Sequence, residues 1–210
     1  MLGDRGNSLW CLIDQKPKNV TTLLEIGMEQ QRLLSQWSAK LETSSGLRLH
    51  VRPASPEDEV QLAQFFDQAS PDDLRFRFLN SIRSVSNSMT HQMTAVDHTG
   101  TENLLAFDAR DDRLAASAML VFDDRMEDAE VAIIVRSDLK GRGIGWDMLN
   151  HACEYARARG ARKIHSVEVR DNRSGIALEH QQGFTGLPCV EDTSLMILTK
   201  DLCLDEARRP

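Results

Sequence analysis

Three glycines at alternate positions stand where an apolar strand pattern gives way to a helical one. The stretch "AEVAIIVRSDLKGRGIGWDMLNHA" (129–152) contains Gly141, Gly143 and Gly145. Glycine lets a main chain approach a ligand closely, and the free amides and dipole of a helix N-terminus favour an anion. The spacing therefore predicts a phosphate or pyrophosphate site at this turn, with a simple packing turn as the alternative.

Two common phosphate-binding patterns do not fit this turn. A P-loop needs Lys followed by Ser or Thr after its last glycine, whereas Trp146 and Asp147 follow Gly145. A dinucleotide-binding turn places its third glycine three residues after the second, and counting from Gly141 and Gly143 that position is Trp146. The site thus belongs to neither of these nucleotide-binding classes.

Composition narrows the classes of protein further. The 210 residues suit one domain with a real core, and 25 Lys and Arg against 32 Asp and Glu give a net charge of −7. That balance argues against general nucleic-acid binding. The four cysteines lie far apart, and no His/Cys/Asp/Glu group has metal-ligand spacing, so no zinc site, other metal site or disulfide framework is expected. No run is apolar enough to cross a membrane and the start lacks a signal-peptide pattern, so we expect a cytoplasmic chain without membrane contact.

The elements around the turn follow from hydrophobic periodicity and helix-start signals. Ser55-Pro56 and Ser70-Pro71 are typical helix beginnings, because serine caps the first turn and proline suits its first position. The alternating segments predict strands, and those with helical period predict helices. The strands are expected in 47–52, 103–111, 113–124, 129–137, 163–172 and 194–202, and the helices in 55–68, 70–80, 86–96, 146–159 and 174–182. This order indicates an α/β fold with a mixed, mostly antiparallel central sheet flanked by helices.

The first part of the chain reads differently from the rest. A helical pattern runs from Thr21 to Leu41, and "ETSSG" (42–46) then reads as a helix stop and linker. We therefore expect an extension, residues 1–46, followed by one domain, residues 47–210. The extension helix would pack on the domain, form a dimer contact or dock onto a partner.

Two motifs resemble the GNAT family of N-acetyltransferases. "LKGRGIG" (139–145) is similar to that family's acyl-CoA pyrophosphate loop, in which Lys140 stands where Gln or Arg is usual. "DNRSGIALEHQQGF" (171–184) is similar to a later segment, with an Asn at a strand end and a Gly-Phe a dozen residues on. With the order of elements, the resemblance covers roughly residues 47–202.

The resemblance implies acetyl-CoA as the acetyl donor. The amides of the turn would hold its pyrophosphate, the cations beside them would add charge, and the strand before the turn would offer main-chain groups to the pantetheine arm. The side chains could instead be ordinary surface or core residues, and Asn172 a helix cap. The implied cofactor-binding residues are Ile133, Val135, Lys140, Gly141, Arg142, Gly143, Ile144, Gly145, Trp146 and Asn172.

The chemistry is attack of an amine on a thioester, and it needs a base because a lysine ammonium has a pKa near 10.4. Glu130 begins the strand that leads into the turn and is the candidate general base, as the resemblance also implies; a surface carboxylate is the alternative. Many members of the family carry a tyrosine acid four residues before the Gly-Phe. Here that position is Glu179, and the sole tyrosine, Tyr155, lies elsewhere, so no tyrosine acid is assigned.

A closer similarity points to the acceptor. The segments 52–66, 72–86 and 129–145 resemble the acetyltransferase module of bacterial protein lysine acetyltransferases. This implies transfer to a protein lysine side chain, with the helices of 56–96, including "DLRFRF" (73–78), around the acceptor. A small-amine acetyltransferase and a non-catalytic acyl-CoA-sensing module are the alternatives. A homodimer is possible on this reading.

Overall fold

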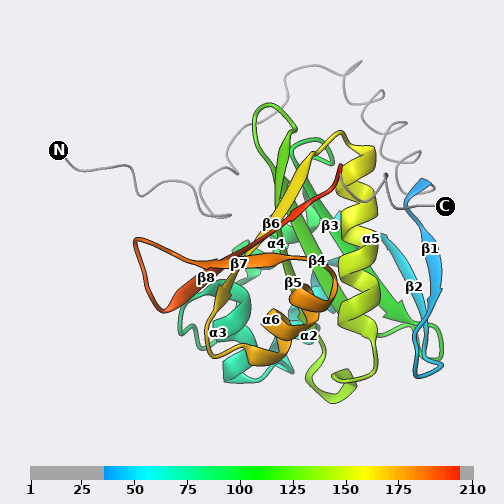
Figure 1. Cartoon of the computed structure of the whole chain (residues 1–210). Coiled ribbons are helices and arrows are strands. Elements are labelled where there is room, and N and C mark those ends of the chain that lie inside the picture. The colour runs from blue at the N-terminus through cyan, green and yellow to red at the C-terminus, as the bar shows by residue number, and fades with distance from the viewer. Residues whose placement is uncertain (1–35, 204–210) are drawn as a thin grey trace.

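The computed structural model describes residues 36–203, which form one eight-stranded sheet with helices on both faces (Figure 1). The strands lie in the order β1-β2-β3-β4-β5-β6-β8-β7. Their bounds are β1 Ala39–Glu42, β2 Arg48–Pro53, β3 Thr101–Asp108, β4 Leu114–Phe122, β5 Asp128–Val135, β6 Lys163–Val169, β7 Thr185–Pro188 and β8 Leu195–Asp201. The helices are η1 Pro56–Asp58, α2 Glu59–Asp67, α3 Pro71–Phe78, α4 Asn87–Thr94, η2 Ser137–Leu139, α5 Ile144–Ala158 and α6 Arg173–Gln181.

The sheet separates two hydrophobic cores. One contains the apolar face of α5 and packs partly against α6, and the other lies under α2, α3 and α4. Because side chains alternate along a strand, neighbouring residues of β5 enter different cores. Val131 belongs to the α5 core, whereas Ile134 belongs to the core under α2–α4.

The parallel contact between β5 and β6 is short. All the other strand pairs are antiparallel, and β5 and β6 pair only from Asp128–Lys163 to Glu130–His165. β5 runs on for five residues and β6 for four beyond that last pair. We call this divergence the fork. The strand pairings confirm the expected mixed, mostly antiparallel sheet. The fork is a feature that the sequence pattern did not indicate.

Local signals account for the helix starts. The side chain of Ser70 accepts a hydrogen bond from the Asp73 amide (3.1 Å) at the start of α3, and Ser86 caps α4 in the same way. Before α2, the Asp58 carboxylate accepts a hydrogen bond from the Ser55 amide (2.8 Å). These contacts satisfy amides that a first helical turn otherwise leaves free.

The structure corrects two expectations. Within the range 21–41, for which a helix was expected, residues 21–35 lie outside the described residues, and Ala39 to Leu41 belong to β1, which pairs with β2. From the sequence, so short an alternating segment could not be told apart from the end of the longer apolar pattern before it. Its pairing with β2 makes it a strand. β7, on the far edge, was not expected because four residues carry too little periodicity. The division of the chain after residue 46 stays a prediction.

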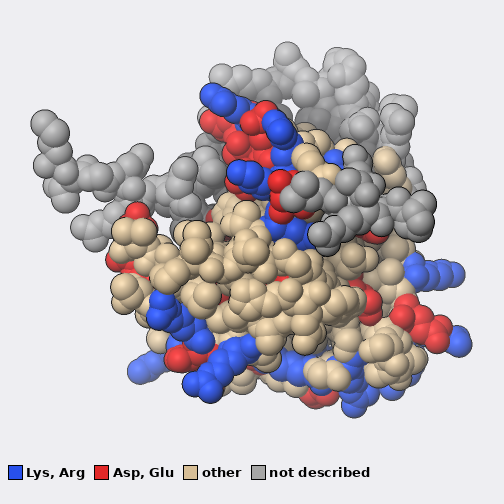
Figure 2. Space-filling model, viewed as in Figure 1, with Lys and Arg blue, Asp and Glu red and all other residues tan. Residues whose placement is uncertain are grey.

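The sheet edge at β7 exposes apolar side chains. Leu187 of β7 is 72% exposed, and Val190, in the turn before β8, is 91% exposed. Figure 2 shows that much of the middle of this face has no Lys, Arg, Asp or Glu, while such residues gather around it. Association of two copies of the chain stays a prediction. Among residues 36–203, no helix has both the length and the apolar character that a membrane span needs.

Asp58 also anchors α2 to the sheet, and this predicts a stability effect. Its carboxylate binds the guanidinium of Arg52 through two hydrogen bonds (2.7 and 2.6 Å), and its side chain is only 7% exposed. We expect Asp58→Ala to lower the free energy of unfolding by about 2 kcal/mol, because it leaves a half-buried cation unpaired. Urea denaturation measures this.

A matched control is the exposed pair of Arg48 and Glu42, whose side chains are 77% and 64% exposed. Glu42→Ala should change the free energy of unfolding by less than about 0.5 kcal/mol. Equal effects of the two substitutions would contradict the anchoring role of Asp58.

Candidate active site

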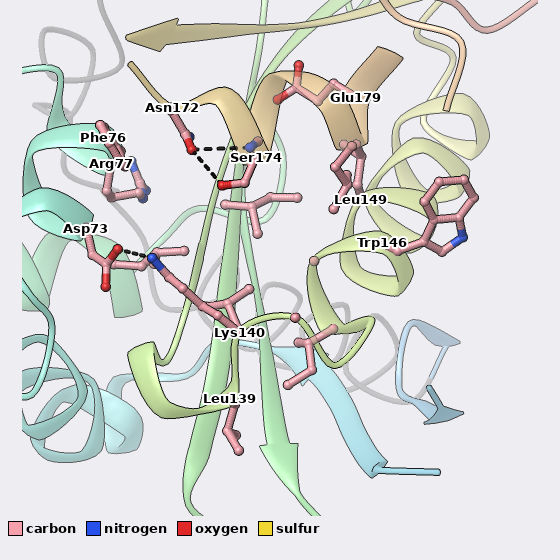
Figure 3. Close-up of a pocket in the computed structure, with 18 of the residues that line it drawn as sticks. Asp73, Phe76, Arg77, Leu139, Lys140, Trp146, Leu149, Asn172, Ser174 and Glu179 are labelled. Atoms are coloured by element: carbon pink, nitrogen blue, oxygen red, sulfur yellow. Dashed lines mark hydrogen bonds and ion pairs between the residues drawn. The ribbon is translucent and has the colours of Figure 1, made fainter. Parts of the chain in front are cut away.

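A cavity of about 360 Å³ opens at the fork and is lined from both faces of the sheet. α3 contributes Asp73 and Arg77 from one side, while α5 and α6 contribute Leu149 and Leu178 from the other. Figure 3 shows these elements surrounding the space, with the β5–α5 turn below it and α6 above. The fork thus creates a passage through the sheet.

Main-chain groups of β5 face this passage. At one end of the strand the Arg136 amide donates to the Ala115 carbonyl (2.8 Å), and at the other the Asp128 carbonyl accepts from the Asp123 amide (3.0 Å). Even-numbered residues of β5 therefore bond to β4, and odd-numbered ones turn their main chain toward β6. Beyond the fork these are Val131, Ile133 and Val135, and the last two line the cavity.

The glycine turn ends at a helix N-terminus that faces the cavity. Gly141 and Gly143 have φ of +71° and +86°, a region that favours glycine, and Gly143 is the residue that precedes α5. The first amides of α5 have no partner within the helix. The structure brings the following predicted residues of the turn to the cavity: Lys140, Gly141, Gly143, Ile144, Gly145 and Trp146.

Lys140 lines the cavity, but its ammonium is ion-paired with Asp73 of α3 (Figure 3). The Asp73 carboxylate also accepts a hydrogen bond from the Ser137 hydroxyl (2.6 Å). Burial would raise the pKa of Asp73, but the hydrogen bonds from Lys140 and Ser137 outweigh it and hold that pKa below its usual value. These contacts tie the turn to α3.

Arg142 lies elsewhere. It lines a second hollow with Arg48 and Arg110, and its carbonyl accepts a hydrogen bond from the Ser45 hydroxyl (2.9 Å). The structure does not bring its side chain to the cavity at the fork. Its predicted contact with a diphosphate is therefore the least supported of the set.

Glu130 lies at the base of the fork, in the last residue pair of β5 and β6. Its side chain is 19% exposed, and its Oε2 lies 3.9 Å from Nε2 of His165, whose Nδ1 contacts the Asp128 carboxylate at 2.8 Å. Burial raises the pKa of Glu130, while His165 and Arg77 oppose the rise. A carboxylate of raised pKa beside a histidine can accept a proton and has a route to release it.

Arg77 reaches the cavity from α3. It is 5% exposed, its Nε has no hydrogen-bond partner, and it lines the cavity. Burial lowers the pKa of Arg77 to about 10, while Glu130 and Glu168 favour its charged form. The guanidinium remains cationic at neutral pH and acts electrostatically on both carboxyl groups.

On the other side of the cavity, two carboxyl groups meet. Glu168 of β6 and Glu179 of α6 both line the cavity, and they lie close enough for each to influence the pKa of the other. Burial and the neighbouring Glu179 raise the pKa of Glu168 to about 8. Asn172 donates its Nδ2 to Glu168 (2.7 Å), and its Oδ1 accepts from the Gly175 amide (3.2 Å), so it caps α6 and also borders the cavity.

Sequence reasoning did not single out Asp73, Arg77, Glu168 or the His165–Asp128 contact. Arg77 stood in a helix whose arginines alternate with phenylalanines, a pattern that is equally typical of a half-exposed helix. For Glu168 a burial signal was present, because the two-residue alternation of a strand puts it on the same face as the buried Ile164. No group of three or more His, Cys, Asp or Glu in the described part of the chain could hold a metal ion.

The fold and the cavity together fit an acyl-CoA. The open strand edge of β5 can pair with an amide-containing arm, and the N-terminus of α5 presents amides to a diphosphate. The glycine turn leaves room for that close approach.

Comparisons with known proteins agree with this geometry. The family model of the acetyltransferase (GNAT) family matches residues 68–184, more than half of the chain. A curated acetyltransferase of Pseudomonas aeruginosa is 26% identical over 163 residues, which are 77% of this chain and 87% of that protein.

Solved structures share the fold. The GNAT domain of S. lividans PAT matches with a TM-score of 0.74 and 23% identity, over 80% of this chain and 98% of that one. The spermidine N-acetyltransferase of Vibrio cholerae, solved with CoA and spermine, matches with a TM-score of 0.63 and 16% identity, over 74% and 96%. With the family model, the glycine turn and the forked sheet in agreement, the chain belongs to the GNAT family and is an acetyl-CoA-dependent N-acetyltransferase.

Proposed function

We propose that the protein transfers the acetyl group of acetyl-CoA to a protein lysine side chain by direct attack, with Glu130 as general base. The observation that carries the catalytic part is the position of Glu130. Its side chain is 19% exposed at the base of the fork and within electrostatic reach of Arg77, which lines the cavity, although Glu130 itself is not among the lining residues. The proposal for the acceptor depends on the resemblance of three segments to bacterial protein lysine acetyltransferases.

Different groups of the site bind different parts of acetyl-CoA. The amides at the start of α5 hold the pyrophosphate, and the free main-chain groups of Ile133 and Val135 pair with the pantetheine arm. Lys140 adds positive charge near the turn although Asp73 partly neutralises it. Asn172 borders the cofactor while it caps α6. Arg142 would have to swing from its hollow to contribute.

Glu130 performs the proton transfer from the attacking amine. Because burial has raised its pKa, Glu130 is a stronger base than an exposed carboxylate, and Arg77 helps keep it ionised. His165, in contact with Glu130 and Asp128, can carry the proton toward solvent. α3 lines the cavity with Asp73, Phe76 and Arg77 and borders the side from which the amine enters.

Substitution of the base is the sharpest kinetic test. We expect Glu130→Gln to lower kcat by about 100-fold or more, because the carboxamide cannot accept the proton. Stabilisation of the protein by added CoA in a thermal-shift assay should remain. Glu127→Gln, at an exposed position three residues earlier, is the control and should keep the wild-type kcat.

The pH profile tests the same assignment. A base works when it is ionised, so kcat should fall as pH falls through the pKa of Glu130, which burial places above the usual value of 4.5. Glu130→Gln should lack this acid limb. A full wild-type rate in Glu130→Gln, at any pH, would overturn the role of Glu130.

The acceptor can be identified directly. We expect purified protein with acetyl-CoA to add acetyl-lysines to proteins of a lysate from cells that lack it, read by mass spectrometry, with Glu130→Gln as the inactive control. Release of CoA thiol with polyamines or other small amines, without new acetyl-lysines, would assign a small-molecule acceptor instead. Binding of CoA without transfer to any amine would contradict catalysis.

A further inference from the structure

A second hollow, of about 560 Å³, lies beside the glycine turn and takes no part in the chemistry described above. Three arginines line it, Arg48, Arg110 and Arg142, together with Ser45 and small or apolar residues. Among the described residues, none that lines it is acidic. The chain as a whole has a net charge of −7, so three guanidinium groups around one space concentrate positive charge against the general balance. We call this space the arginine hollow.

Hydrogen bonds to main-chain carbonyls hold the walls of the arginine hollow together. Arg48 begins β2, Arg110 lies in the turn between β3 and β4, and Arg142 lies in the glycine turn. The Ala109 amide donates to the Arg48 carbonyl (3.0 Å), and the Ser45 hydroxyl donates to the Arg142 carbonyl (2.9 Å). Three segments that are distant in the sequence are therefore fixed around one space.

The three guanidinium groups keep donors that a ligand can use. Arg110 binds the Asp108 carboxylate, which is 0% exposed, through its Nε (3.0 Å) and its Nη2 (2.6 Å), and this leaves its Nη1 available. Arg48 has the exposed Glu42 as its ion-pair partner, at 3.5 Å. Among residues 36–203, the Arg142 carbonyl is bonded to Ser45, but the guanidinium of Arg142 has no partner. One well-fixed and two weakly held cations thus line the same space.

We propose that the arginine hollow is a binding site for a phosphate monoester. Such a group carries a charge close to −2 at neutral pH and has three terminal oxygens, so each guanidinium can bind it. A guanidinium presents two parallel N–H groups whose spacing matches two oxygens of a phosphate. A carboxylate has one charge and two oxygens, and it would leave part of the charge of the hollow unmatched. The volume leaves room for a small organic group attached to the phosphate.

Successive residues of the glycine turn line different spaces. Gly141 and Gly143 line the cavity at the fork, whereas Arg142 between them lines the arginine hollow, and no described residue lines both. The loop that carries Ser45 also packs closely on the turn, since a Cβ on Gly143 would lie 2.9 Å from the Ser44 hydroxyl oxygen. The phosphate monoester site is therefore separate from the diphosphate site at the start of α5, and the turn lies between them.

Two sources can supply a phosphate monoester here. One is a small phosphorylated molecule that binds beside acetyl-CoA, and the other is the ribose phosphate of CoA itself. The separation of the two spaces favours the first source. A small phosphorylated ligand on Arg142 would hold the same turn that contacts the donor, so the affinities of the two ligands would be linked.

Dephospho-CoA, which lacks the ribose phosphate, isolates the arginine hollow experimentally. At saturating concentration it occupies the diphosphate site at α5 and leaves the hollow open. We expect inorganic phosphate, titrated at constant ionic strength, to raise the melting temperature of this complex in a saturable way. Arg48→Gln and Arg110→Gln should each raise the apparent Kd for phosphate by about tenfold or more, because each removes a charge-assisted contact.

The matched control is Arg125→Gln. Arg125 is exposed in the turn between β4 and β5, at the opposite end of β4 from Arg110 and outside the hollow, so the apparent Kd for phosphate should not change. If Arg110→Gln lowers stability because Asp108 loses its partner, Arg48→Gln still tests the site, since Arg48 is 77% exposed. Phosphate that fails to stabilise the wild-type complex, or that stabilises all three variants as it does the wild type, would overturn the proposal.

The same titration with CoA in place of dephospho-CoA identifies the source of the phosphate. Continued stabilisation by phosphate supports a separate phosphorylated ligand. Loss of the effect supports the ribose phosphate of CoA as the occupant, if CoA also binds at least about tenfold more tightly than dephospho-CoA and Arg48→Gln reduces that ratio. Either result supports a phosphate monoester site in the hollow.

The outcomes separate this proposal from the proposed function, because no step of the test uses an amine. Acetyl transfer without any effect of phosphate would overturn the phosphate site alone. If neither CoA nor dephospho-CoA stabilises the protein, the binding of the donor is contradicted. The phosphate titration of the protein alone, compared among the wild type and the three variants, then still decides whether the hollow binds phosphate.

Discussion

The fork between β5 and β6 is the constraint on which the rest of the site depends. After Glu130 and His165 the two strands stop pairing, so a sheet that is otherwise continuous leaves main-chain donors and acceptors unmatched at its centre. Buried main-chain groups need partners, and their lack is costly. The opening therefore offers a free main-chain edge with which a bound ligand containing amide groups can pair.

Arg77 organises the charges that face this opening. A buried guanidinium without neighbouring carboxylates would be very unfavourable, and here Glu130 and Glu168 favour its charged form from two sides. The two carboxyl groups differ in their other neighbours: His165 opposes the rise in the pKa of Glu130, whereas burial and Glu179 raise the pKa of Glu168 to about 8.

Much of the fold was predictable because its signals are local. Ser70 capping α3 and the alternation through β2 and β6 depend on a few consecutive residues. The glycine turn was also predictable, since Gly141 and Gly143 need unusual backbone angles. The Lys140–Asp73 and Glu168–Glu179 contacts join residues from separate elements, and the fork is a property of strand pairing. None of these features can be predicted from a few consecutive residues.

The odd-numbered residues of β5 turn their main-chain groups toward β6, and this has a consequence for how the sequence of this enzyme can change during evolution. If the donor is recognised through main-chain groups of Ile133 and Val135, the side chains at those positions are constrained mainly by packing against the α5 core. Exchanges among apolar residues there leave those main-chain groups in place, so homologues can differ widely in sequence and still pair with the donor in the same way. Selection for a new acceptor would act on α3 instead, which lines the cavity from the other face of the sheet, and would leave binding of the donor unchanged.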